Sequence, residues 1–163
     1  MSVDQNSKGA LKLKFLSHGT LSSRDLDFAR KFYEEFLGLE VVRTSHRSLM
    51  IRLGGANTIA VVLTNKITQQ DHLNHNGLDV ETKADVDAAY ERILNEKDKW
   101  KIGHITKPVE QHGTYAFFFR DADENVWEIL TNPQGGYSWL FEQGDLPGKG
   151  HHEKDFRRPG RED

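Results

Sequence analysis

A carboxylate stands in the middle of an otherwise apolar segment that has the composition of a β-strand. Glu128 lies between Trp127 and Ile129 in the segment 126–130. Removing such a charge from water costs several kcal/mol unless an opposite charge or a bound cation compensates it. The sequence therefore predicts a specific partner for Glu128, and either the nearby Arg120 or a metal ion could supply it.

Two histidines occupy matching places in the two halves of the chain. His18 lies near the end of the first expected strand, and His75 lies in the first strand of the second half. Two imidazoles and one carboxylate are the ligand set of a mononuclear site with open positions, which is typical of non-haem iron, and manganese, nickel or zinc could also accept it. In the alternative without a metal, His75 caps a turn, His18 is half exposed and Glu128 pairs with Arg120.

The elements that would position these residues follow one order twice: strand, helix, three strands. Alternating and helical periodicities place the expected strands at 11–18, 39–44, 48–53, 58–64, 72–80, 100–106, 114–119 and 126–130, and the helices at 22–37 and 82–95. Thr82, with Asp85 three residues later, is expected to cap the second helix. We therefore expect an α+β chain with a disordered N-terminus (1–10), two βαβββ modules (11–66 and 67–132) and a C-terminal extension (133–163). In this overlay Val62 takes the place of Glu128 in the first half.

Composition narrows the function classes. The chain has 163 residues, a formal charge of −3 with both signs well mixed, and no cysteine. This excludes thiolate metal sites and a cysteine nucleophile, and nothing suggests a nucleic-acid or membrane surface. No apolar run approaches the roughly 18 residues that span a bilayer, and the polar N-terminus lacks a signal-peptide core. A cytoplasmic protein is the expectation.

Three stretches carry a resemblance to a known family: DLDFARKFYEEFLGLEVV, NHNGLDVETKADVDAAYERI and FFFRDADENVWEIL. Together they resemble the vicinal oxygen chelate superfamily, which includes glyoxalase I, extradiol dioxygenases, fosfomycin-resistance enzymes and bleomycin-binding proteins. Ala122 and Glu124 replace the proline and glycine that are usual in the last motif. The resemblance implies paired βαβββ modules, each curling a small mixed sheet around a metal. It also implies that His18, His75 and Glu128 are the ligands, and that the protein is a homodimer. Whether the modules pair within one chain or are exchanged between two stays open.

The resemblance favours an extradiol ring-cleaving dioxygenase that holds Fe²⁺ and acts on a small aromatic substrate with vicinal oxygens. Glyoxalase I uses a fourth protein ligand, a carboxylate, where this chain has Val62. A bleomycin-binding protein usually lacks the ligand set that is present here. A metal-dependent lyase or isomerase of the glyoxalase type is the second expectation, and an antibiotic-binding resistance protein is the third.

Proton transfer in extradiol enzymes uses a tyrosine at the position of Phe118 and a histidine further upstream. Phe118 has no hydroxyl group, so the candidates for catalysis here are His112 and Tyr115. Strand alternation puts Tyr115 and Phe118 on opposite faces, and the sequence does not decide which face lines the cavity. His151 and His152 lie in a glycine- and charge-rich tail, where we do not expect a rigid ligand platform.

Overall fold

The structure is a computed structural model that describes residues 10–11, 15–132, 136–153 and 155–156. The chain divides into two compact units, Met1–Lys66 and Ile67–Asp163. Within the described residues each unit contains one four-stranded sheet of mixed direction and few helices, so the expected α+β class is confirmed. The predicted disorder of residues 1–10 falls almost entirely outside the described residues. None of the described helices has the length and apolar character needed to cross a membrane.

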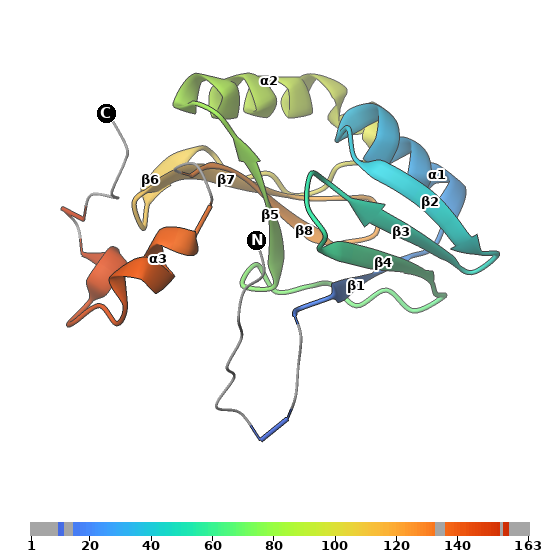
Figure 1. The fold of residues 1–163 in the computed structure, drawn as a ribbon. Helices are drawn as coiled ribbons and strands as arrows, with labels where there is room; N and C mark the ends of the chain where they lie inside the picture. The colour runs from blue at the N-terminus through green and yellow to red at the C-terminus, as the bar shows by residue number, and fades with distance from the viewer. Residues whose placement is uncertain (1–9, 12–14, 133–135, 154, 157–163) are drawn as a thin grey trace. The chain divides into compact units, whose positions relative to one another are not determined.

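The first unit is a sheet in the order β1-β4-β3-β2, with one helix packed on it (Figure 1). Its elements are β1 (His18–Ser23), α1 (Leu26–Lys31), a π-helical turn (Phe32–Phe36), β2 (Glu40–Ser45), β3 (Ser48–Arg52) and β4 (Thr58–Leu63). β1 runs parallel to β4, and α1 packs on β3 and β4. Leu49, Ile51 and Val61 form the centre of its core.

The first strand begins where the sequence analysis expected it to end. β1 starts at His18, and Ser22 and Ser23, expected at the start of the helix, still pair with β4. Asp25 is the cap, because its carboxylate accepts the backbone N–H groups of Asp27 and Phe28.

The second unit repeats the arrangement, with the sheet order β5-β8-β7-β6. Its elements are β5 (His75–Val80), α2 (Lys83–Trp100), β6 (Val109–Gln111), β7 (Thr114–Arg120), β8 (Val126–Thr131), α3 (Ser138–Gln143) and a 3₁₀ turn (Gly150–His152). The capping box predicted at Thr82 and Asp85 is confirmed. The strand expected at 100–106 is wrong: Trp100 is the last residue of α2, and its indole N–H donates to Glu96 one helical turn earlier.

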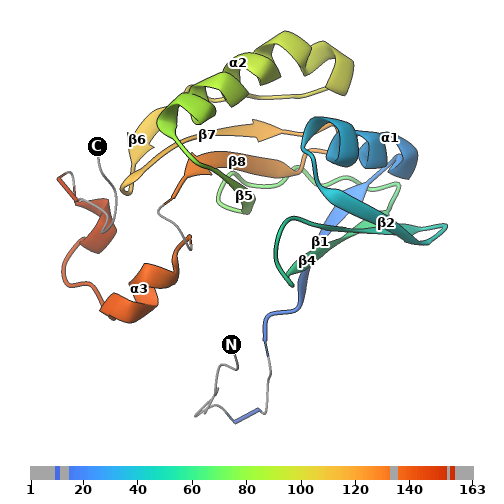
Figure 2. The ribbon, with the colours of Figure 1, turned by 45° about the horizontal axis from the view of Figure 1, so that its top comes forward.

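The helix α2 covers one face of the second sheet (Figures 1 and 2). The ring of Tyr90 on α2 lies 5.4 Å from the ring of Phe117 on β7. Side chains alternate along a strand, so Phe118 points to the opposite face, and it pairs in register with Glu128 on β8. Glu128 therefore belongs to the face that α2 does not cover.

The turn between β7 and β8 is organised by one buried carboxylate. Asp121 accepts the backbone N–H groups of Asp123 and Asn125, the amide of Asn125 and the indole N–H of Trp127, over 2.9–3.2 Å. Burial raises the pKa of Asp121, and the hydrogen bonds from Trp127 and Asn125 oppose that rise. This network fixes the register in which β8 returns beside β7, and with it the position of Glu128.

The turn network makes a stability prediction. Replacing Asp121 by alanine leaves several buried donors without an acceptor, at roughly 1–3 kcal/mol each, so we expect the free energy of unfolding to fall by about 3 kcal/mol or more. Urea titration followed by circular dichroism measures this. The exposed Glu91→Ala on α2 is the control and should change stability by less than about 0.5 kcal/mol. Equal stability of the two variants would contradict the role given to Asp121.

Candidate metal centre

Glu128 lies at the centre of the face of the second sheet that α2 does not cover. In register it stands between Gly77 of β5 and Phe118 of β7. Only 7% of the residue is exposed, although it carries an ionisable group. A carboxylate at this depth needs a compensating partner.

The imidazole of His75 faces this carboxylate. Nε2 of His75 lies 3.3 Å from Oε2 of Glu128, and the ring packs edge-on against Phe118 with 4.9 Å between ring centroids. On its other side, Nδ1 of His75 lies 2.7 Å from the backbone carbonyl oxygen of His72. Both ring nitrogens of His75 therefore have defined neighbours, and 30% of the side chain remains exposed.

The carbonyl contact decides which nitrogen of His75 carries a proton. A carbonyl oxygen can only accept a hydrogen bond, so Nδ1 donates to His72. In the neutral imidazole, Nε2 then presents a lone pair to a carboxylate oxygen, which is also an acceptor. Two acceptors at this distance require a proton, carried by the ring or by the carboxyl group, or a cation that both atoms bind. A backbone carbonyl on the far nitrogen is also the usual outer partner of a metal-binding histidine.

Arg120 makes its polar contacts elsewhere. Its guanidinium donates to the backbone carbonyl oxygens of Glu124 and Gln70, at 3.2 and 2.7 Å, and lies 3.8 Å from the Glu124 carboxylate. Among the described residues, the partners of this guanidinium therefore do not include Glu128. The alternative in which Arg120 neutralises Glu128 loses its support.

His18 belongs to the first unit and is described within it. It is the first residue of β1, as His75 is of β5, and its Nδ1 lies 2.7 Å from the Ser17 hydroxyl. The structure thus brings together two of the three predicted ligands, His75 and Glu128, inside the second unit.

The strand register corrects the residue that matches Glu128 in the first unit. Glu128 pairs with the residue two positions after His75. The residue two positions after His18 is Thr20, and it pairs with Ala60 rather than Val62. The prediction that this place is apolar is confirmed, since alanine carries no ligand atom.

Neither predicted catalytic residue lies beside Glu128. The hydroxyl of Tyr115 donates to Asp87 of α2 at 2.7 Å, on the helix-covered face, and this bond raises the pKa of the tyrosine. His112 lies in the turn before β7, whereas the pairing partner of Glu128 is Phe118. Four strand residues, about 13 Å, separate the start of β7 from Phe118.

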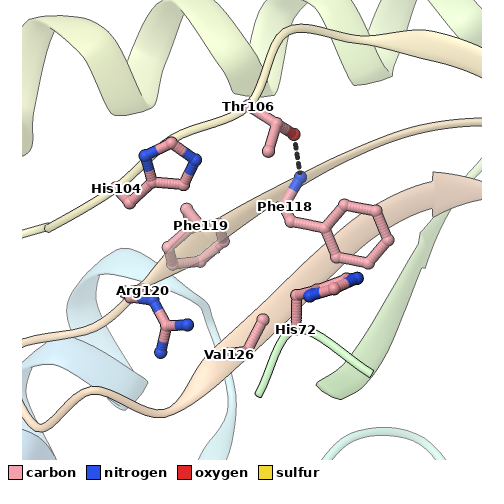
Figure 3. A pocket seen from close by; sticks show the side chains of 7 residues that line it. All are labelled: His72, His104, Thr106, Phe118, Phe119, Arg120 and Val126. Carbon is pink, nitrogen blue, oxygen red and sulfur yellow. Dashed lines mark hydrogen bonds between the residues drawn. The ribbon is translucent and has the colours of Figure 1, made fainter. Parts of the chain in front are cut away.

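A cavity of about 250 Å³ lies next to Phe118 in the second unit (Figure 3). Its lining consists of His72, His104, Thr106, Phe118, Phe119, Arg120 and Val126. Val126 pairs in register with His75, and the cavity wall therefore adjoins the candidate ligands. This volume lies just below the range of typical ligand pockets, which begins at about 300 Å³.

Solved structures of low sequence identity share the fold. The fosfomycin resistance protein FosX from Listeria monocytogenes, complexed with Mn(II) and sulfate, matches with a TM-score of 0.60 and 20% identity over 82% of this chain and 100% of that chain. A possible glyoxalase from Bacillus cereus matches with a TM-score of 0.59 and 20% identity, over 72% of this chain and 99% of that chain. Lactoylglutathione lyase from Agrobacterium tumefaciens matches with a TM-score of 0.53 and 21% identity, over 74% of this chain and 95% of that chain.

No curated protein matches the sequence. A family model does: the model of the Glyoxalase/Bleomycin resistance protein/Dioxygenase superfamily matches residues 15–129, which span parts of both units and include all three predicted ligands. The chain belongs to the Glyoxalase/Bleomycin resistance protein/Dioxygenase superfamily.

Proposed function

We propose that this protein is a metal-dependent enzyme of the vicinal oxygen chelate type, in which His75 and Glu128 hold one divalent cation and His18, of the same chain or of a partner copy, supplies the third ligand that the superfamily resemblance implies. The observation that carries the proposal is the 3.3 Å approach of His75 Nε2 to Glu128 Oε2, with Nδ1 of the same ring engaged by a carbonyl. Two donors of one ion bound at about 2.0–2.2 Å stand roughly 3.0–3.5 Å apart, so this spacing suits a shared cation.

Each residue of the proposed centre has a separate task. Glu128 supplies negative charge from a buried strand, and the His72 carbonyl fixes the ring of His75. Phe118 provides a flat apolar wall beside that ring, which suits a planar substrate. A bound cation would act as a Lewis acid toward two neighbouring oxygens of the substrate.

The first specific reaction that we propose is extradiol cleavage of a catechol-like substrate, with Fe²⁺ as the metal. Two histidines and one carboxylate leave open positions for a bidentate substrate and for dioxygen. Ala60 supports this, because the place of the fourth protein ligand of glyoxalase I holds no ligand atom here.

The second specific reaction that we propose is a metal-dependent lyase or isomerase reaction that does not use dioxygen. Phe118 lacks the hydroxyl that ring cleavage uses, and Tyr115 and His112 lie away from Glu128. Two proteins of similar fold support it: one is a lactoylglutathione lyase, and the other, FosX, is complexed with Mn(II) rather than iron. A small-molecule binding protein is the candidate from another class.

Gly77 leaves room for the carboxylate. A Cβ atom at this position would lie 3.2 Å from Cδ2 of Leu130 and 3.6 Å from Oε2 of Glu128. A branched side chain would therefore occupy the space next to the proposed ligand. At Gly19 in the first unit, no described atom lies within 4 Å of the corresponding Cβ.

The two glycines form a matched pair for a packing test. Gly77→Val should destabilise the metal-free protein by about 1–3 kcal/mol, as overpacking of a filled site does, and should weaken metal binding. Gly19→Val should be neutral or slightly stabilising, because β-branched residues favour strands. Denaturant titration in the presence of a chelator measures both. The same loss in both variants would contradict the proposed crowding at Glu128.

The proposed ligand set predicts which substitutions weaken metal binding. The His75→Ala, Glu128→Ala and His18→Ala variants should each lose more than about 100-fold in affinity for the cation, because even outer partners contribute about 10–100-fold. The exposed His46→Ala is the control and should bind like the original protein. Isothermal titration with Mn²⁺ gives the affinities. Unchanged binding by the Glu128→Ala variant, in a folded protein, would reject the centre.

The dependence of turnover on dioxygen distinguishes the ring-cleaving dioxygenase from the lyase or isomerase. Protein reconstituted anaerobically with Fe²⁺ should consume dioxygen with a catechol-like substrate, and both oxygen atoms should appear in the ring-opened product. An oxygen electrode and mass spectrometry with labelled dioxygen measure this. Turnover with Mn²⁺, Ni²⁺ or Zn²⁺ in the absence of oxygen would favour the lyase or isomerase. Tight binding of an aromatic compound that survives a chelator, without turnover, would favour the binding protein.

A further inference from the structure

Three histidines meet at a second place in the second unit. The ligand atoms of His112, His151 and His152 all lie within 4.8 Å of one another. The ring of His152 lies 4.2 Å from both the ring of His112 and the ring of His151, centroid to centroid. His112 and His152 are exposed, and His151 is half-buried.

Two segments far apart in the sequence bring these rings together. His112 is in the turn between β6 and β7, with φ at +53°, and Gly113 follows at +70°. Positive φ at both central residues of a hairpin turn favours asparagine followed by glycine, so a histidine here is not the locally preferred residue.

The other two histidines belong to the 3₁₀ turn Gly150–His152. Both views draw the segment after α3 beside the end of the sheet where β6 joins β7 (Figures 1 and 2). Aromatic contacts hold this segment: Phe156 stacks on Trp139 of α3 at 5.8 Å and lies 6.5 Å from the ring of His151.

We propose that His112, His151 and His152 bind a second metal ion, a divalent transition metal of the zinc, nickel or copper group. Imidazoles are preferred ligands for these ions. Zinc–nitrogen bonds of about 2.0–2.1 Å place three nitrogens roughly 3.4 Å apart, so each ring needs to move by under about 1 Å. Three protein ligands leave one position of a tetrahedral ion open to water or a small anion.

This site is distinct from the centre built on Glu128. His112 lies in the turn before β7, beyond the stretch of about 13 Å that leads to Phe118, and the rings of His151 and His152 lie beside it. The ion would tie the C-terminal segment to the β6–β7 hairpin, because its ligands come from both. The glycine- and charge-rich composition of this segment gave no reason to expect ligands in it.

Zinc titration of the full-length Glu128→Ala protein tests this site with the first centre disabled. We expect one zinc ion per chain, and Co²⁺ in its place should give the visible absorption of a tetrahedral nitrogen site. Adding His112→Ala, His151→Ala or His152→Ala to that background should weaken zinc binding by more than about 10-fold. Adding His46→Ala, in an exposed turn of the first unit, should leave it unchanged.

Limited proteolysis provides a second readout that does not depend on enzyme activity. Trypsin cleavage after the exposed Lys149 should slow when zinc is bound, and His112→Ala should abolish this protection. Failure of the Glu128→Ala protein to bind zinc would overturn the second site. Zinc affinity unchanged by His112→Ala would also overturn it, because binding would then rest on the adjacent pair His151 and His152 alone. Neither result bears on the proposed centre at Glu128.

Discussion

The contact between the His75 imidazole and the Glu128 carboxylate constrains the rest of the second unit. A buried carboxylate and a ring nitrogen whose proton lies on the opposite side face one another at 3.3 Å as two acceptors, so a proton or a cation must lie between them. Arg120 does not provide that cation, because it is bound to Glu124 and Gln70. A shared cation satisfies the facing acceptor atoms of the pair, and so does a proton held by either group.

The surrounding fold fixes this pair from several directions. Parallel pairing of β5 with β8 places His75 and Glu128 on the same face, two register positions apart. The Asp121 network holds the turn that returns the chain into β8. Gly77 leaves space beside the carboxylate, while α2 covers the other face and contributes no residue to the pair. A strand platform of this kind holds ligand atoms with little freedom.

Sequence periodicity predicted the repeated element order and singled out Glu128, because both depend on local patterns of apolar and polar residues. Register was not accessible in the same way: Ala60, rather than Val62, matches Glu128 only once the pairing of β1 with β4 is known. Alternation showed that Tyr115 and Phe118 face opposite ways, but only the packing of α2 shows which face is covered. His112 lies about 40 positions before His151 and His152 in the sequence. No local pattern of residues therefore predicts that the three rings come together.

The most direct measurement is ¹⁵N NMR of the His75 side chain in histidine-labelled protein during titration with Zn²⁺. The account predicts that Nδ1 keeps its proton, donated to the His72 carbonyl, while Nε2 shifts from a free to a metal-bound nitrogen as one ion binds. The same titration of the Glu128→Ala variant should leave Nε2 unshifted. An Nε2 that stays protonated and bonded to Glu128 throughout would show a simple ion pair and contradict the metal centre.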